Sequence, residues 1–127
     1  MIDHLDHLVL TSCDPDATIA FYTGVLGMKL ESFGQGRRAF LFGNQKINLH
    51  VRGREFEPKA HLPVPGALDL CFIADRPLDQ VIETLNARGV TIIEGPVSRT
   101  GATGPIRSVY LRDPDFNLIE ISEYAAS

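Results

Sequence analysis

The sequence predicts an α+β protein built from two modules of the order β-α-β-β-β. Two segments carry the same series of signals: a short apolar run, an acidic residue with a proline close behind, an amphipathic run and a glycine. The first segment runs from His7 to Gly27 and the second from Asp69 to Gly89, and 27 − 7 and 89 − 69 both equal 20. A repeat of this kind, here offset by 62 positions, indicates one folding unit that is used twice.

The first module begins with an apolar run at residues 7–11, which predicts a strand. The following Asp14-Pro15-Asp16 predicts a helix start, because proline suits the first helical position. Gly27 ends that helix, whose apolar face carries Ile19, Tyr22 and Leu26. Three further strands are expected at residues 28–33, 39–42 and 46–51, with a tight turn at Gly43-Asn44.

The second module repeats this order with a strand at residues 69–73 and a helix start at Asp75-Arg76-Pro77. Its helix carries apolar residues at i, i+3, i+4 and i+7, namely Leu78, Val81, Ile82 and Leu85. Strands are then expected at 90–94, 106–112 and 117–122, with a long loop at 95–105. We therefore expect residues 1–127 to form one domain, with module 1 at about 4–51, a linker at 52–66 and module 2 at 67–123.

Composition and charge limit the functions that the chain can have. A net charge of −4 and a pI near 5.5 argue against nucleic acid or an anionic membrane as the main partner. The start has neither a basic region nor an apolar run of the secretory type, and no apolar stretch approaches the roughly 20 residues of a membrane span. Cys13 and Cys71 are interpreted as small buried thiols in a reduced cytoplasm, which predicts a cytoplasmic protein.

Three polar residues inside apolar strands predict a metal site: His7, His50 and Glu120. Imidazole and carboxylate groups bind divalent cations, whereas a strand core has little other use for them because an unpaired buried charge is costly. A structural histidine and a solvated outer face are the alternatives. For His50 the two interpretations have nearly equal weight.

Longer motifs occur in both modules: Asp6-His7-Leu8-Val9-Leu10, the segment FYTGVLGM at 21–28, and LRDPDFNLIE at 111–120. Together they resemble those of the vicinal oxygen chelate superfamily. That superfamily includes glyoxalase I, fosfomycin-resistance thiol transferases, extradiol dioxygenases, methylmalonyl-CoA epimerase and bleomycin-resistance proteins. Residues 42–60 are most similar to the glyoxalase-domain-containing protein 5 type.

The resemblance implies that the modules form a curved mixed sheet around a cavity, in a glyoxalase-like homodimer. It also implies one divalent metal (Ni, Zn, Mn or Fe), held by residues on the first and last strands of each module. His7 and Glu120 match those positions. Alignment places Asn48 opposite Glu120, but His50 lies on the same strand face and imidazole is the better ligand, so we predict His50. Asp69, where many relatives have histidine, is expected as a ligand or in the second shell.

Two more positions follow from the same resemblance. Ser108 and Tyr110 match the positions at which fosfomycin-resistance proteins contact substrate, although Tyr110 could equally be a half-buried strand aromatic. Phe116 stands where relatives commonly have glycine, so the turn there must be reshaped or strained.

The function implied is that of a metal-dependent enzyme, whose small-molecule substrate chelates the metal through two adjacent oxygens. The metal would act as a Lewis acid, and the leading chemistry is that of a lyase or isomerase, with Glu120 or Asp69 as the base. An Fe(II) extradiol-type dioxygenase and a thiol transferase fit the same residues. A ligand-sequestering protein of the bleomycin-resistance kind, without metal, is the non-enzymatic alternative.

Overall fold

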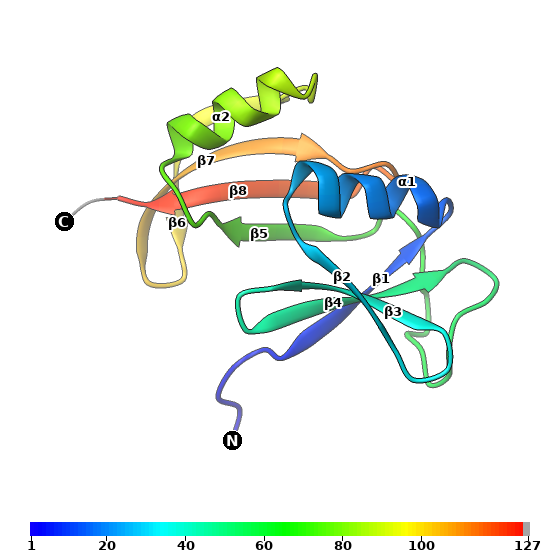
Figure 1. Ribbon diagram of the computed structural model, residues 1–127. Helices are drawn as coiled ribbons and strands as arrows, with labels where there is room; N and C mark the ends of the chain where they lie inside the picture. The colour runs from blue at the N-terminus through cyan, green and yellow to red at the C-terminus, as the bar shows by residue number, and fades with distance from the viewer. Residues whose placement is uncertain (126–127) are drawn as a thin grey trace. The chain divides into compact units, whose positions relative to one another are not determined.

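The structure is a computed structural model that describes residues 1–125. The chain divides into two compact units (Figure 1). Unit 1 comprises residues 1–68 and 114–116, and unit 2 comprises residues 69–113 and those from 117 onward.

Unit 1 contains a mixed four-stranded sheet in the order β1-β4-β3-β2. Its strands are β1 (His7–Ser12), β2 (Lys29–Phe33), β3 (Arg37–Phe42) and β4 (Gln45–Val51). β1 pairs with β4 in parallel, and the other two pairings are antiparallel. Helix α1 (Pro15–Ile19), continued by the π-helical segment η1 (Ala20–Val25), connects β1 to β2.

The helix of unit 1 is fixed to one face of its sheet. The Asp14 carboxylate caps α1 by accepting a hydrogen bond from the Ala17 backbone N–H at 3.2 Å. The Tyr22 ring is fully buried and stacks on Phe40 of β3, with ring centroids 5.1 Å apart. The helix thus covers one face of the sheet, and the alternate residues of β1 and β4 point to the opposite face.

Unit 2 repeats this arrangement in the order β5-β8-β7-β6. It contains β5 (Asp69–Ile73), α2 (Leu78–Ala87), β6 (Glu94–Gly101), β7 (Gly104–Arg112) and β8 (Leu118–Tyr124). β5 pairs with β8 in parallel, while β6, β7 and β8 are antiparallel neighbours. Helix α2 runs along β7 and β8 (Figure 1). The prediction of two βαβββ modules is confirmed.

Strand β6 differs from the sequence prediction. We expected a strand at 90–94 and a loop at 95–105, but β6 begins at Glu94 and continues to Gly101. Its pairing with β7 shifts between Glu94 and Val97, which marks a bulge. Gly95 has a φ of 110° there, and a Cβ at this position would lie 2.4 Å from the Ser108 carbonyl oxygen. Glycine and proline, which normally indicate a loop, are accommodated because β6 is an edge strand.

The turn before β8 keeps a left-handed residue although no glycine is present. Phe116 has a φ of 66° and its side chain is 73% exposed. The Asp113 carboxylate closes the turn by accepting hydrogen bonds from the backbone N–H and the side-chain amide of Asn117, at 2.9 and 2.8 Å. Of the two expectations for Phe116, the strained conformation is the one observed.

Among the described residues, neither helix reaches the length and apolar character that crossing a bilayer requires.

Candidate functional site

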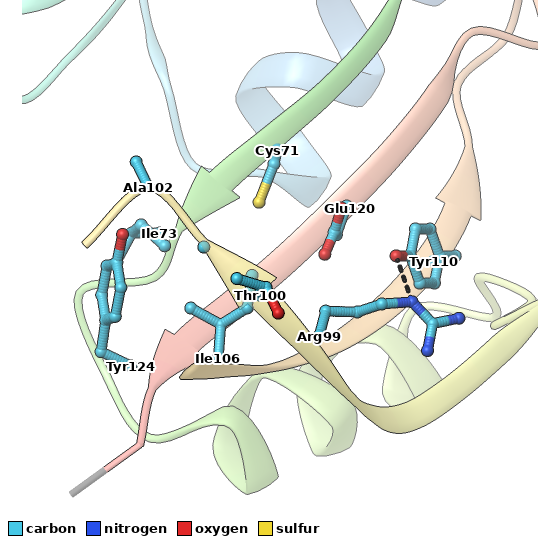
Figure 2. A pocket seen from close by; sticks show the side chains of 10 residues that line it. Cys71, Ile73, Arg99, Thr100, Ala102, Ile106, Tyr110, Glu120 and Tyr124 are labelled. Carbon is cyan, nitrogen blue, oxygen red and sulfur yellow. Dashed lines mark hydrogen bonds between the residues drawn. The ribbon is translucent and has the colours of Figure 1, made fainter. Parts of the chain in front are cut away.

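Four side chains form a row across the sheet of unit 2. In the register of the strands, Cys71 of β5 pairs with Glu120 of β8, Glu120 with Tyr110 of β7, and Tyr110 with Glu94 of β6. Residues that are paired directly across neighbouring strands point to the same face of a sheet. Figure 2 shows Cys71, Glu120 and Tyr110 projecting from their strands on this face.

Glu120 is held by two serine hydroxyls. Ser108 donates a hydrogen bond of 2.6 Å to Glu120 Oε2, and Ser122 donates a longer one of 3.4 Å to the same oxygen. The two serine hydroxyls also lie 2.6 Å apart, and both serines are fully buried. Because both serines donate to Oε2, the other carboxylate oxygen of Glu120 can still bind a cation or a proton.

Tyr110 is oriented by an arginine on the edge strand. Arg99 Nε donates a hydrogen bond of 3.0 Å to the Tyr110 hydroxyl, drawn as the dashed line in Figure 2. The same guanidinium reaches Glu94 at 3.4 Å. Its hydrogen bond to Tyr110, supported by Glu94, raises the pKa of Arg99. Since the phenol oxygen accepts from Arg99, the hydroxyl proton of Tyr110 is available for another acceptor.

Two adjoining hollows of about 400 and 420 Å³ lie over this row. Both are lined by Arg99, Tyr110 and Glu120. Asp69 and Arg112 line the second hollow, and Cys71 lines the first. Hollows of this size accept a small molecule. Of the predicted residues, unit 2 thus brings together Glu120, Ser108, Tyr110 and Asp69.

Cys13 and Cys71 are both exposed, so the expectation of small buried thiols is wrong. The environment of Cys71 nevertheless favours the protonated thiol. Its Sγ lies 3.3 Å from the Ser122 hydroxyl. Partial desolvation of the sulfur raises the pKa of Cys71, while the hydrogen bond with Ser122 opposes this shift. The nearby carboxylates of Glu120 and Asp69 raise the pKa further, because negative charge disfavours the thiolate.

His7 lies at the start of β1 in unit 1, beside a carboxylate. Its Nδ1 and Asp6 Oδ2 are 2.8 Å apart, and this hydrogen bond lowers the pKa of Asp6. A histidine whose Nδ1–H is fixed by a carboxylate presents Nε2 to a metal, which is the usual arrangement of metal-binding histidines. The His7 side chain is 44% exposed, so a ligand can reach that nitrogen.

His50 and Asn48 lie on β4, two residues apart and on the same sheet face. Both are buried, and both ring nitrogens of His50 and Oδ1 of Asn48 lack a hydrogen-bond partner among the described residues. Burial lowers the pKa of His50, and the positive charge of Arg37 lowers it further; both effects favour the neutral imidazole. Buried polar atoms without partners require an explanation, and a bound ligand supplies one.

The strand registers identify equivalent positions in the two modules. His7 of β1 pairs with Lys46 of β4, and Asn48 lies two residues after Lys46. In the same way, Asp69 of β5 pairs with Leu118 of β8, and Glu120 lies two residues after Leu118. Asn48 and Glu120 therefore occupy equivalent positions. By the same counting, His50 is equivalent to Ser122. His50 pairs with Thr11, four residues from His7 and thus roughly 13 Å along the strand. Asn48 is therefore the residue of β4 nearer to His7, and the identity of the module 1 ligand stays a prediction.

Within residues 1–125 of one chain, the structure contains no group of three or more His, Cys, Asp or Glu side chains arranged to hold a metal ion. His7 and His50 belong to unit 1 and Glu120 to unit 2. Sequence reasoning missed the contributions of Ser122 and Glu94. The spacing of Ser122 from Glu120 was a usable signal, because residues two apart share a strand face. The position of Glu94 beside Tyr110 could not be predicted, because it depends on the bulge in β6.

Comparisons with known proteins agree with this architecture. The family model of the Glyoxalase/Bleomycin resistance protein/Dioxygenase superfamily matches residues 4–121. Virulence protein STM3117 of Salmonella typhimurium is 56% identical over 124 residues, which are 98% of this chain and 86% of that protein. Its crystal structure superimposes with a TM-score of 0.97 and covers 98% of this chain and 99% of that one.

Two further proteins, one compared by sequence and one by structure, are similar to this chain. Glyoxalase domain-containing protein RDO1 of Mycosarcoma maydis is 58% identical over 120 residues, covering 94% of this chain and 68% of that protein. A lactoylglutathione lyase from Agrobacterium tumefaciens is 25% identical with a TM-score of 0.74, and the match covers 97% of this chain and 95% of that one. The chain belongs to the glyoxalase/bleomycin resistance protein/dioxygenase superfamily.

Proposed function

We propose that the protein is a metal-dependent enzyme acting on a small substrate with two adjacent oxygens, by lyase or isomerase chemistry. The proposal includes a homodimer, in which modules from two chains complete each site, and a cytoplasmic location. The likeness in fold to a lactoylglutathione lyase supports this chemical subclass.

The observation that carries the proposal is the environment of Glu120. Its Oε2 is held by Ser108 and Ser122, and the side chain lies in the wall of a hollow large enough for a small molecule. A carboxylate fixed through one oxygen presents the other in a defined direction. This is what both a metal ligand and a general base require.

The side chains present fit a divalent metal. His7 offers Nε2 behind an Asp6-bound Nδ1, and Glu120 offers its second oxygen. Either His50 or Asn48 of β4 supplies a third donor, since both have unpartnered buried atoms among residues 1–125. Asp69 serves as a ligand or orients one. A bound divalent cation would act as a Lewis acid on the two substrate oxygens.

The remaining residues act on the substrate directly. The Tyr110 hydroxyl, which accepts from Arg99, donates its own proton in a hydrogen bond to a substrate oxygen. Ser108 holds Glu120 through Oε2, and the base that removes a proton from the substrate is either the other oxygen of Glu120 or, when that oxygen binds the metal, the carboxylate of Asp69 in the second hollow.

Elemental analysis of the purified protein tests the metal site. Wild-type protein should contain close to one divalent ion per chain, and His7→Ala and Glu120→Gln should both lose it. His4→Ala is a matched control, because His4 also pairs with a preceding aspartate but is not a proposed ligand. Absence of metal from the wild type after reconstitution would refute the metalloenzyme.

The metal found also separates the chemical subclasses. Iron, together with oxygen consumption in the presence of a catechol, would favour an extradiol-type dioxygenase. Nickel, zinc or manganese would favour the lyase or isomerase.

A metal-free binding protein of the bleomycin-resistance kind is the second candidate. It is favoured by the carboxamide of Asn48 at the position equivalent to Glu120 and by Asp69 at the position equivalent to His7. Tight binding of a small ligand by protein that contains no metal, without turnover, would support this candidate.

A further inference from the structure

We propose that the substrate carries an apolar substituent of about the size of an aromatic ring, which binds between Ile73, Ile106 and Tyr124 of unit 2. The inference rests on the proposed function, because these residues line the same hollow as Glu120 and Tyr110. It concerns a part of the substrate that does not contact the metal, so the two proposals can fail separately.

The first hollow has a polar end and an apolar end. Tyr110 of β7 pairs with Glu120 of β8, and Ile106 pairs with Tyr124 four residues away along both strands. Residues four apart share a strand face and lie about 13 Å from each other. Figure 2 shows Ile106 and Tyr124, together with Ile73 of β5, on the side of the hollow away from Tyr110.

The large apolar side chains that unit 2 leaves exposed gather at the hollows. In the part of unit 2 that the structure describes, they are Ile73, Ile93 and Tyr124, which are 51%, 48% and 39% exposed. Ile73 and Tyr124 line the first hollow, and Ile93 lines the second. Exposed apolar surface that is gathered in a hollow is typical of a ligand-binding groove. An apolar substituent suits this end, because its binding removes apolar surface from water on both sides.

Tyr124 is held in place at the end of β8. Its hydroxyl accepts a hydrogen bond of 3.4 Å from the backbone N–H of Thr103, in the turn between β6 and β7. A Cβ at Gly101 would lie 3.1 Å from Tyr124 Cε1 and 2.8 Å from Ile106 Cγ2, so the backbone there packs closely against both side chains. The ring is thus fixed at its hydroxyl and supported along its edge, and it closes this end of the hollow.

The surface between the two ends offers no free polar group to a ligand. The hydroxyls of Ser108 and Ser122 lie there, but both serines are fully buried and are already hydrogen-bonded to each other and to Glu120. A substrate confined to the polar end would leave Ile73 and Tyr124 in water. The substrate is therefore amphipathic, with its oxygens at Glu120 and its apolar substituent directed along β7 and β8.

Binding of indole to chelator-treated protein tests the apolar subsite. The chain contains no tryptophan, so the fluorescence of indole reports its binding directly. Wild-type protein should bind one indole saturably, with NMR shifts at the methyl groups of Ile73 and Ile106. Ile73→Ala and Tyr124→Ala should each weaken binding about three- to tenfold, because each removes apolar contact surface.

Ile93→Ala is the matched control, because it removes an isoleucine of nearly equal exposure from the second hollow. It should bind indole like the wild type. Tyr124→Phe keeps the ring and should stay within about twofold of the wild-type affinity. Thermal unfolding of each variant shows whether it is folded.

Three results would overturn the subsite. They are no saturable binding by folded wild-type protein, equal losses in Ile73→Ala and Ile93→Ala, or an unchanged indole affinity of Tyr124→Ala with a shifted monomer–dimer equilibrium. The last result would assign the apolar end to contact between two copies of the chain.

Metal analysis of the same preparations before chelator treatment separates the two proposals. One divalent ion per chain without indole binding would refute the apolar substituent and leave the metal site standing. Indole binding by a protein that takes up no metal would support the subsite and refute the metalloenzyme, because indole has no pair of oxygens with which to chelate a cation.

Discussion

Asn48 on β4 and Glu120 on β8 occupy the same position in the two modules. Each lies two residues beyond the partner of a first-strand residue, His7 in module 1 and Asp69 in module 2. The repeated backbone therefore places a carboxamide in one module where it places a carboxylate in the other. If this position binds metal in both modules, module 1 has the weaker donor.

Replacing that carboxamide by a carboxylate should strengthen metal binding. Asn48→Asp keeps the size of the side chain, and we expect the affinity for Mn²⁺ to rise about tenfold. Without metal the same variant should be less stable by about 1–3 kcal/mol, because it buries a carboxylate that lacks a partner. Isothermal titration with Mn²⁺ and thermal unfolding with and without the ion measure both effects.

Asn44→Asp is the control for this change, because it adds the same charge in the exposed turn between β3 and β4. It should change neither the affinity nor the metal dependence of unfolding. If Asn48→Asp behaves like Asn44→Asp, position 48 is not a metal position and His50 becomes the remaining candidate on β4.

The serine that holds Glu120 should contribute to metal binding without contacting the metal. Ser108→Ala removes the 2.6 Å hydrogen bond to Oε2, and the loss of such an outer contact typically lowers metal affinity about 10- to 100-fold. Ser98→Ala on β6 removes an exposed hydroxyl and should have no effect. Equal affinities for the two variants would show that Ser108 does not orient Glu120.

The thiol of Cys71 should react slowly with alkylating reagents. Its raised pKa leaves little thiolate at neutral pH. The rate of alkylation should therefore rise with pH, and the midpoint of this rise should lie above the usual cysteine pKa of about 8.5. In a Cys13→Ser background, iodoacetamide should modify Cys71 several-fold more slowly than it modifies free cysteine. Glu120→Gln should accelerate the reaction, because it removes a negative charge that opposes the thiolate. A rate that is insensitive to this substitution would contradict the assigned cause.

Phe116 should be replaceable by glycine with a gain in stability. Its φ of 66° lies in the left-handed region, which is unfavourable for an L-residue with a bulky side chain. Since the side chain is largely exposed, we expect Phe116→Gly to raise the free energy of unfolding by about 1 kcal/mol. Denaturant unfolding measures this difference. A less stable glycine variant would mean that contacts of the Phe116 ring outweigh the backbone strain.

Much of the fold could be predicted because its signals are local and occur twice. Periodic apolar positions marked the helix faces, and the acidic and proline residues before each helix marked the starts. Strand β6 could not be predicted, because Gly95 and Pro96 normally interrupt strands. Only pairing with β7 makes them a bulge at the edge of a sheet.

For His7 and Glu120 the residue type alone indicates metal binding, and that role stays a prediction. The relation between Asn48 and His50 could not be predicted, because alternation along β4 puts both on one face and only the pairing with β1 separates their positions.

The bulge at Gly95 has a consequence for attempts to redesign the pocket. Any side chain at this position would press against the backbone of Ser108 and push β6 outward. Arg99 lies on the displaced strand, so its hydrogen bond to the Tyr110 hydroxyl would weaken although neither residue had been changed. A library that randomised only the residues in contact with substrate would thus leave out Gly95, which controls the width of the pocket. Conversely, shortening Arg99 should relax the specificity of the pocket with less damage to the sheet than any change at Gly95.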